Sequence, residues 1–254
     1  MNPIKMRNNK NHSGDLLLLH FIILILAFTA ILGKLISLKA DDLVWYRMLI
    51  AFGGIAFYLK ISPKAASVTK KQMYSYLFVG VIIAAHWFTF FESIKVSNVS
   101  IALVGLSVTT LFVAVLQPLF LKQKIIGYEV ILGIMTIAGI ATIFNVEPQY
   151  TKGLLFGLLS AFLAALFSLS NAKLVKKNNA TVISFYEMLG GVLILSLVFL
   201  LQGKFTLAFF RVSAVDWGWL LVLGLVCTSF AYVGTVKVLR SLSPFTVSIA
   251  INLE

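Results

Sequence analysis

The chain has 254 residues, of which 60% are hydrophobic and only 12% charged, and its mean hydropathy is +0.98. Soluble domains are about a quarter charged and under half apolar, so this composition excludes a water-soluble fold and indicates an integral membrane protein. The net charge of +12 would suit a nucleic-acid partner in a soluble protein. Here the basic residues stand in short gaps between apolar runs, where they set topology and contact lipid headgroups, so no nucleic-acid binding is expected.

Apolar runs long enough to cross a membrane follow one another along the chain. A helix crosses the hydrocarbon layer of about 30 Å in about 20 residues. Eight runs have this length, at residues 16–36, 43–61, 74–94, 98–121, 127–145, 153–174, 181–201 and 216–238. A ninth run begins at Ser243 and has 12 residues, about 18 Å of helix, which is too short to span. The predicted fold class is therefore an all-α integral membrane protein.

The distribution of Lys and Arg predicts the orientation of these helices. The N-terminal tail and the loops after the second, fourth, sixth and eighth helices, with the helix ends beside them, hold 14 of the 21 basic residues. The opposite loops hold six. Because basic residues stay on the cytoplasmic side, the N-terminal tail, residues 1–15, is expected in the cytoplasm. Arg47, the remaining basic residue, lies inside the second helix.

The second half of the sequence repeats the first half weakly and in the same order. WYRMLIA at 45–51 aligns with FYEMLGG at 185–191, an offset of 140. IKVSNVSIALVGLSVT at 94–109 aligns with LRSLSPFTVSIAINLE at 239–254, an offset of 145. The first unit holds five spans, an odd number, so the second copy enters the membrane from the opposite side. Such an inverted repeat is typical of secondary transporters, which place the substrate between the two copies near the midplane.

These residues resemble a known family. The run HWFTFFESIKVSNVSIALVGLSVTTLFVAVLQPLFLKQKI and the closing SPFTVSIAINLE are similar to the matching stretches of the two repeats of EamA-like transporters, in the drug/metabolite transporter superfamily. The segments WYRML and SIKVSNVSIAL resemble members from Bacteroidetes-type bacteria. The resemblance implies a ten-helix transporter of the bacterial inner membrane, with both termini cytoplasmic. Its two inverted five-helix repeats, here 16–146 and 153–254, would surround a central cavity.

Compared with that pattern, the sequence stops early. Glu254 aligns with Thr109, partway through the fourth helix of the first repeat. About 35 to 45 residues would follow in a complete second repeat, so the ninth helix is expected to be incomplete and the tenth missing. Glu254 is then expected to be an intramembrane glutamate and a candidate for coupling transport to a proton.

Arg47 and Glu187 are ionisable residues inside predicted spans, and the cost of placing them there makes them functional candidates. They occupy equivalent repeat positions with opposite charges, and each follows a tyrosine, Tyr46 or Tyr186. One interpretation places these residues at the two mouths of a substrate pathway, Arg47 outside and Glu187 toward the cytoplasm. The other is that each charged side chain reaches out to its nearer membrane surface, as long side chains near helix ends do.

The third predicted helix carries two more ionisable residues, His86 and Glu92. They are six positions apart, about 240° round a helix at 100° per residue, so they do not share a face. His86 is a candidate for the pathway, or else a hydrogen-bonded packing residue. Glu92, like Glu187, is a candidate proton carrier.

Aromatic residues extend the candidate pathway. Trp87 aligns with Tyr232, and Phe90 aligns with Thr235, so rings and hydroxyls from both repeats could wall one cavity. The alternative is that the rings only pack between helices.

Three polar residues interrupt apolar spans. Ser107 aligns with Asn252, and Asn171 lies in the sixth predicted helix. Such groups could bind substrate, or they could join helices by hydrogen bonds worth about 1 kcal/mol each.

Several motifs of enzymes are absent from the sequence. It has no GxxxxGK[ST] loop, HExxH, GxSxG or Cys/His cluster, and Cys227 is its single cysteine. We therefore expect no enzyme, no cofactor and no metal site. The predicted function is a secondary transporter that exports a small metabolite, such as an amino acid, across the lipid bilayer by alternating access. Its energy coupling stays open between a proton as a further partner and facilitated transport without coupling. A channel without coupled transport, or a structural or partner-binding membrane subunit, is the alternative.

Overall fold

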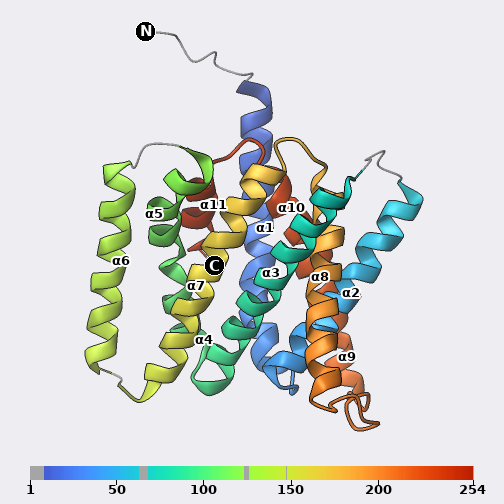
Figure 1. The fold of residues 1–254 in the computed structure, drawn as a ribbon. Coiled ribbons are helices and arrows are strands. Elements are labelled where there is room, and N and C mark those ends of the chain that lie inside the picture. Colours follow the sequence, from blue (N-terminus) through green and yellow to red (C-terminus); the bar gives the residue numbers. More distant parts are fainter. Residues whose placement is uncertain (1–8, 63–67, 123–125, 147, 254) are drawn as a thin grey trace.

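The computed structural model describes residues 9–62, 68–122, 126–146 and 148–253, and all regular structure in these residues is helical (Figure 1). The helices form one bundle, with α6 at one edge beside α5 and with α2 and α9 at the opposite edge. The all-α fold predicted from composition is confirmed.

The helix boundaries follow local capping signals. Thr69 and Gln72 form a capping box at the start of α3, and Ser243 caps α11, which has Pro244 at its first position. Two short elements join the α-helices: the 3-10 helix η1 (Pro148–Tyr150) and the π-helix η2 (Val222–Phe230). The α-helices are α1 (Asn9–Leu35), α2 (Ala40–Ile61), α3 (Lys70–Val96), α4 (Val99–Ser107), α5 (Thr109–Leu121), α6 (Gly127–Val146), α7 (Thr151–Leu174), α8 (Ala180–Leu201), α9 (Ala214–Leu221), α10 (Ala231–Val238) and α11 (Pro244–Ile251).

The outer surface of the bundle is apolar. On α1, large exposed side chains recur every three or four residues, at Leu17, Phe21, Leu24, Phe28, Ile31 and Leu35. A stripe of this kind is unfavourable in water and favourable against lipid. Within the described residues, seven helical segments are long and apolar enough to cross a membrane. The chain is therefore a multi-pass membrane protein.

Seven of the eight predicted spans coincide with these segments, and the other one, 127–145, coincides with α6. The ninth apolar run contains α11. The predicted intramembrane Glu254 lies outside the described residues. The total of ten helices stays a prediction.

Two spans that we expected to be single α-helices are not regular. Span 98–121 consists of α4 and α5, which meet at Val108. There the hydroxyls of Ser107 and Thr109 donate to carbonyls three residues back, at 2.7 and 2.6 Å, and such bonds compete with the helical backbone pattern. Span 216–238 consists of α9, η2 and α10, and within η2 the Thr228 hydroxyl donates to the carbonyl five residues back. That spacing belongs to the wider turn of a π-helix.

Helix α3 packs against α7 and α8 at the centre of the bundle. A Cβ atom at Gly80 would collide with the backbone carbonyl of Glu187, and one at Gly190 would collide with the backbone of Leu77. Glycine at these two positions lets the backbones of α3 and α8 touch. This contact helps to bury Glu187 completely, on the face of α8 that meets α3.

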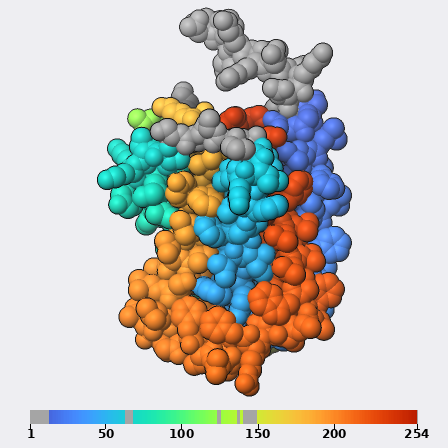
Figure 2. All heavy atoms as spheres, turned by 90° about the vertical axis from the view of Figure 1, so that its right-hand side faces the viewer, coloured from blue at the N-terminus to red at the C-terminus, as the bar shows by residue number. Residues whose placement is uncertain are grey.

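A cluster of rings and charges lies at the end of the bundle where α8 leads into α9. Phe205 and Phe209 of the linker pack edge to face, with centroids 5.3 Å apart. The Lys204 ammonium lies 2.5 Å from a carboxylate oxygen of both Asp41 and Asp42, at the start of α2. In Figure 2, orange residues from this part of the chain cover the lower end of α2. The linker is thus fixed to α2 at this end.

We expect Gly80→Ala to destabilise the bundle, because the added methyl group meets the backbone of α8 rather than a movable side chain. The free energy of unfolding in detergent should fall by about 1–3 kcal/mol, as for other overpacked cores. Gly53→Ala is the matched control, since a Cβ there meets nothing within 4 Å. Thermal unfolding followed by circular dichroism measures both, and equal melting temperatures would contradict this description of the contact.

A second prediction concerns Lys204. Burial lowers the pKa of this amine, but the hydrogen bond to Asp41 and the negative charges of Asp41 and Asp42 outweigh it, so the pKa is raised above its ordinary value. The stabilisation is therefore complete below the unfolded pKa of about 10.4 and is lost as pH rises through the higher folded pKa. Lys204→Gln should lower stability by about 1 kcal/mol at neutral pH, and the difference should vanish in strong alkali. Lys204→Arg should stay close to wild type in the same melting experiment.

Candidate functional site

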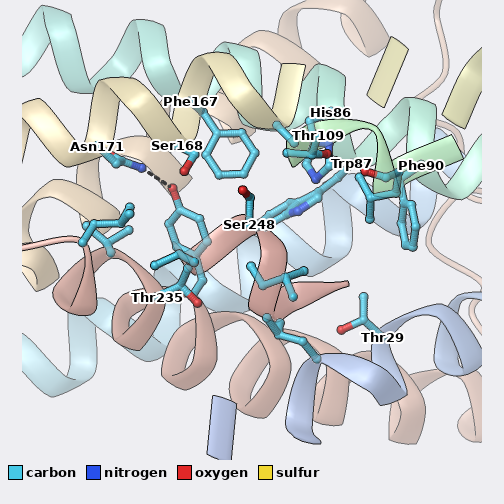
Figure 3. Close-up of a pocket in the computed structure, with 18 of the residues that line it drawn as sticks. Thr29, His86, Trp87, Phe90, Thr109, Phe167, Ser168, Asn171, Thr235 and Ser248 are labelled. Atoms are coloured by element: carbon cyan, nitrogen blue, oxygen red, sulfur yellow. Dashed lines mark hydrogen bonds between the residues drawn. The ribbon is translucent and has the colours of Figure 1, made fainter. Parts of the chain in front are cut away.

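A cavity of about 130 Å³ lies inside the bundle. Side chains from α1 to α5 and from α7, η2, α10 and α11 line it, so both halves of the chain contribute. In Figure 3, Asn171 lies toward one side of the view, Thr29 and Phe90 toward the other, and Ser248 between them. The cavity therefore occupies the place between the two halves where the sequence repeat led us to expect a substrate.

Seven residues that the sequence proposed for the pathway line this cavity. They come from α2, α3, α7, α10 and the C-cap of α11: Arg47, His86, Trp87, Phe90, Asn171, Tyr232 and Asn252. Thr235, the repeat partner of Phe90, lines it as well. The rings and hydroxyls of the two repeats thus meet at one cavity.

Other proposed residues lie away from the lining: Tyr46, Glu92, Ser107, Tyr186 and Glu187. Tyr46 donates a hydrogen bond to the carbonyl of Phe209 at 3.1 Å, in the linker between α8 and α9. Tyr46 lies outside the lining although Arg47 lines the cavity, because neighbours on a helix point about 100° apart. Ser107 is bonded within α4, and Glu92 is half-buried on another face of α3.

Arg47 is held inside the bundle by an aromatic ring and a hydroxyl. Only 2% of its surface is exposed. Its guanidinium carbon lies 3.9 Å from the centroid of Trp87, and its Nε donates to Oγ1 of Thr228 at 2.7 Å. The Thr228 proton is already given to a backbone carbonyl within the π-helix, so its oxygen is free to accept from Arg47. A cation–π contact and a charge-assisted hydrogen bond thus stabilise a cation at the cavity wall.

Glu187 is completely buried behind the cavity wall. Its Oε2 accepts a hydrogen bond from the Tyr232 hydroxyl at 2.9 Å, and that hydroxyl accepts one from Asn171 Nδ2, also at 2.9 Å. The rings of Tyr232 and Trp87 meet edge to face at 5.8 Å. A continuous set of contacts therefore leads from Arg47 over these two rings to Glu187.

The burial of the pair contradicts one of its two interpretations. A charged side chain that reached out to its nearer membrane surface would be exposed, whereas Arg47 and Glu187 are buried. The role of the pair in a substrate pathway stays a prediction. Both lie in the interior because their own helices pack closely with neighbours that supply polar or aromatic partners. The repeat located the pair, but the partners come from tertiary contacts.

His86 both packs and lines the cavity. Its Nδ1 lies 2.9 Å from the carbonyl of Ser160 and 2.8 Å from the Ser160 hydroxyl, and its ring packs on Phe167 with centroids 5.1 Å apart. The two sequence interpretations of His86 are therefore not exclusive.

Some lining residues escaped the sequence analysis. They include Thr29 of α1, Phe167 and Ser168 of α7, and Ser248 of α11. Thr29 could have been found, because it is an isolated hydroxyl within an apolar run. Ser168 and Phe167 carry no local signal, since serines and aromatics are common in packed membrane helices.

The chemistry of the site is that of binding. Among the described residues, no group of three or more His, Cys, Asp and Glu could hold a metal ion. The polar side chains at the described wall include hydroxyls, amides, an imidazole, the Trp87 indole, the Cys227 thiol and the Arg47 guanidinium. Such a wall can hold a small polar molecule by hydrogen bonds and charge.

The chain is similar to the members of one known family of membrane proteins. The model of the EamA-like transporter family matches the chain twice, over residues 13–145 and 151–254. Twelve chains of solved structures match it, among them one described as "Crystal structure of protein", with a TM-score of 0.71 and 13% sequence identity over 95% of this chain and 84% of the other. At that identity the likeness concerns the fold alone. No curated protein matches the chain.

We predict that Thr228→Val lowers the stability of the bundle by about 1–3 kcal/mol, because it removes the acceptor of a buried guanidinium N–H. Thr228→Ser keeps the hydroxyl and should retain most of the stability. Thermal unfolding in detergent measures both variants. If valine and serine behave alike, the hydroxyl does not hold Arg47.

Proposed function

The chain belongs to the EamA-like transporter family and is a multi-pass membrane transporter, and we propose that it exports a small carboxylate-bearing metabolite, such as an amino acid, by alternating access. In this proposal the repeats 16–146 and 153–254 rock against each other in the inner membrane, with the N-terminus in the cytoplasm. The substrate occupies the cavity that residues of both repeats line.

The observation that carries the proposal is the charge of the cavity wall. Arg47 lines the cavity, and no Asp or Glu is among the described residues that do so. A cation in a low-dielectric site attracts an anionic group strongly, and the planar guanidinium suits a carboxylate. The wall therefore favours a substrate with a carboxylate near Arg47.

The rest of the wall favours a small molecule with both polar and apolar parts. The volume of about 130 Å³ suits a small metabolite rather than a peptide or a lipid. The rings of Trp87, Phe90 and Phe167 provide apolar contact, and Ser168, Ser248 and neighbouring hydroxyls provide hydrogen bonds. An amino acid has this combination of groups.

Alternating access is supported by the packing of α3 and α8. These helices belong to different repeats, and their backbones touch at Gly80 and Gly190. A contact of this kind is suited to small sliding or rocking movements.

Counterflow in proteoliposomes tests the proposal. Vesicles loaded with one unlabelled amino acid at a time should accumulate the same labelled amino acid, with saturation, for at least one member of the standard set. Arg47→Gln should raise the KM of that substrate about 10- to 100-fold, because a charge-assisted bond to its carboxylate is lost. Arg211→Gln is the matched control, since Arg211 is exposed and outside the cavity.

The other function classes give different results in the same vesicles. A channel would show flux without saturation or counterflow, and a structural subunit would show no flux. Wild-type kinetics in Arg47→Gln would remove the carboxylate-binding role of Arg47.

A further inference from the structure

Glu187 reaches the cavity through Tyr232. The Glu187 side chain is completely buried, and its Oε2 accepts a hydrogen bond from the Tyr232 hydroxyl at 2.9 Å. Tyr232 lines the cavity, whereas Glu187 does not. A change at the carboxyl therefore reaches the cavity through the Tyr232 hydroxyl and through Asn171, a second lining residue that interacts with the carboxyl.

That hydroxyl has one proton and two lone pairs. Its proton is donated to Glu187, and one lone pair accepts from Asn171 Nδ2. While Glu187 is ionised, Tyr232 thus has only a lone pair left for a group in the cavity. A protonated Glu187 donates its own proton to the tyrosine oxygen, and the tyrosine proton then becomes available to the cavity.

The helices packed against α8 present few charges to Glu187. Tyr76 of α3 and Tyr232 of α10 interact electrostatically with its carboxyl. Helix α2, the third neighbour, carries Arg47, whose guanidinium is bonded to Thr228. Oε1 of Glu187 has no hydrogen-bond partner in the described part of the chain. A buried carboxylate with one unbonded oxygen is costly, and a proton removes that cost.

We propose that the protonation of Glu187 switches Tyr232 from a hydrogen-bond acceptor to a donor at the cavity wall, so that a substrate ammonium group and a proton exclude each other. The proton comes from water and forms an O–H bond at Oε2 of Glu187. The proton of Tyr232 stays on its own oxygen and only changes its acceptor. This inference rests on the proposed function, since it assigns the second charged group of the transported molecule.

The switch explains how export would be coupled. With Glu187 ionised, the tyrosine lone pair and the negative charge behind it attract a substrate ammonium, while Arg47 attracts the carboxylate. With Glu187 protonated, that negative charge is gone and a hydroxyl proton faces the ammonium. Substrate leaves when a proton arrives, which exchanges an inward proton for an outward amino acid.

Infrared difference spectroscopy of the reconstituted protein tests the switch without any substrate. Between alkaline and acidic buffer, a protonated-carboxyl band should appear, and a tyrosine C–O band should shift with the same pH midpoint. Glu187→Gln should abolish the carboxyl band, and Tyr232→Phe should abolish the tyrosine band. Glu129→Gln and Tyr74→Phe are matched controls outside the cavity and should keep both bands.

The mutual exclusion of the substrate ammonium group and the proton is tested by adding an equimolar mixture of the standard amino acids to the reconstituted protein at acidic pH. The carboxyl band should shrink in wild type, and a mixture of the corresponding acids without the amino group should leave it unchanged. In counterflow, Tyr232→Phe should weaken amino-acid binding about three- to tenfold, the loss of one hydrogen bond.

The outcomes separate this inference from the proposed function. A carboxyl band that survives in Glu187→Gln, or a tyrosine band that does not follow it in wild type, overturns the switch. Amino-acid counterflow with no effect of amino acids on the band overturns the exclusion and leaves the transport function standing. If no amino acid is transported, the proposed function fails, and the joint titration of the two bands still decides whether the switch exists.

Discussion

The burial of two opposite charges in a lipid-facing bundle is the constraint that the rest of the structure satisfies. A guanidinium or a carboxyl at membrane depth is costly unless the protein supplies partners. Arg47 has a ring face and a hydroxyl, and Glu187 has a phenol that an amide supports in turn. Each partner lies on a different helix from the charge, so these contacts fix how α2 sits on α3 and η2, and how α8 sits on α10.

The two sites are related by the repeat but are not equivalent. In each half, the charged residue of one helix meets the aromatic residue of the next, Trp87 for Arg47 and Tyr232 for Glu187. The cation lies on the cavity wall, and the carboxyl lies behind its tyrosine. In the first repeat the charged residue itself, Arg47, therefore lines the cavity. In the second repeat the Tyr232 hydroxyl lines it, with the Glu187 carboxyl hydrogen-bonded behind.

The fold class and many of the residues that line the cavity could be predicted from the sequence, and the reason is physical. Lipid imposes long apolar helices, and duplication keeps equivalent positions recognisable, so run length and offset located the spans, Arg47, Trp87 and Tyr232. Side-chain partners could not be obtained in this way. The bond between Arg47 and Thr228 joins residues 181 positions apart, and the break at Val108 depends on hydroxyls that also occur in unbroken helices. Tyr46 shows the same limit, since it adjoins Arg47 in sequence but its side chain lies outside the cavity lining.

The π-helix η2 also records how the two copies diverged. Helices α2 and α8 both have 22 residues, but Tyr232 follows Glu187 by 45 positions where Trp87 follows Arg47 by 40. Four of the extra residues lie in the linker 202–213, which has 12 residues against eight in 62–69. The fifth lies within the span itself, because Trp87 is the eighteenth residue of α3, whereas Tyr232 is the nineteenth residue of the span that begins with α9. In a regular α-helix the extra residue would rotate the Tyr232 side chain about 100° about the helix axis, away from Trp87. The wider turn of η2 takes up the extra residue, so Tyr232 still faces Trp87. A difference of one residue in length is thus accommodated inside the membrane, and the same turn carries the Thr228 hydroxyl that accepts a hydrogen bond from Arg47 of the first copy.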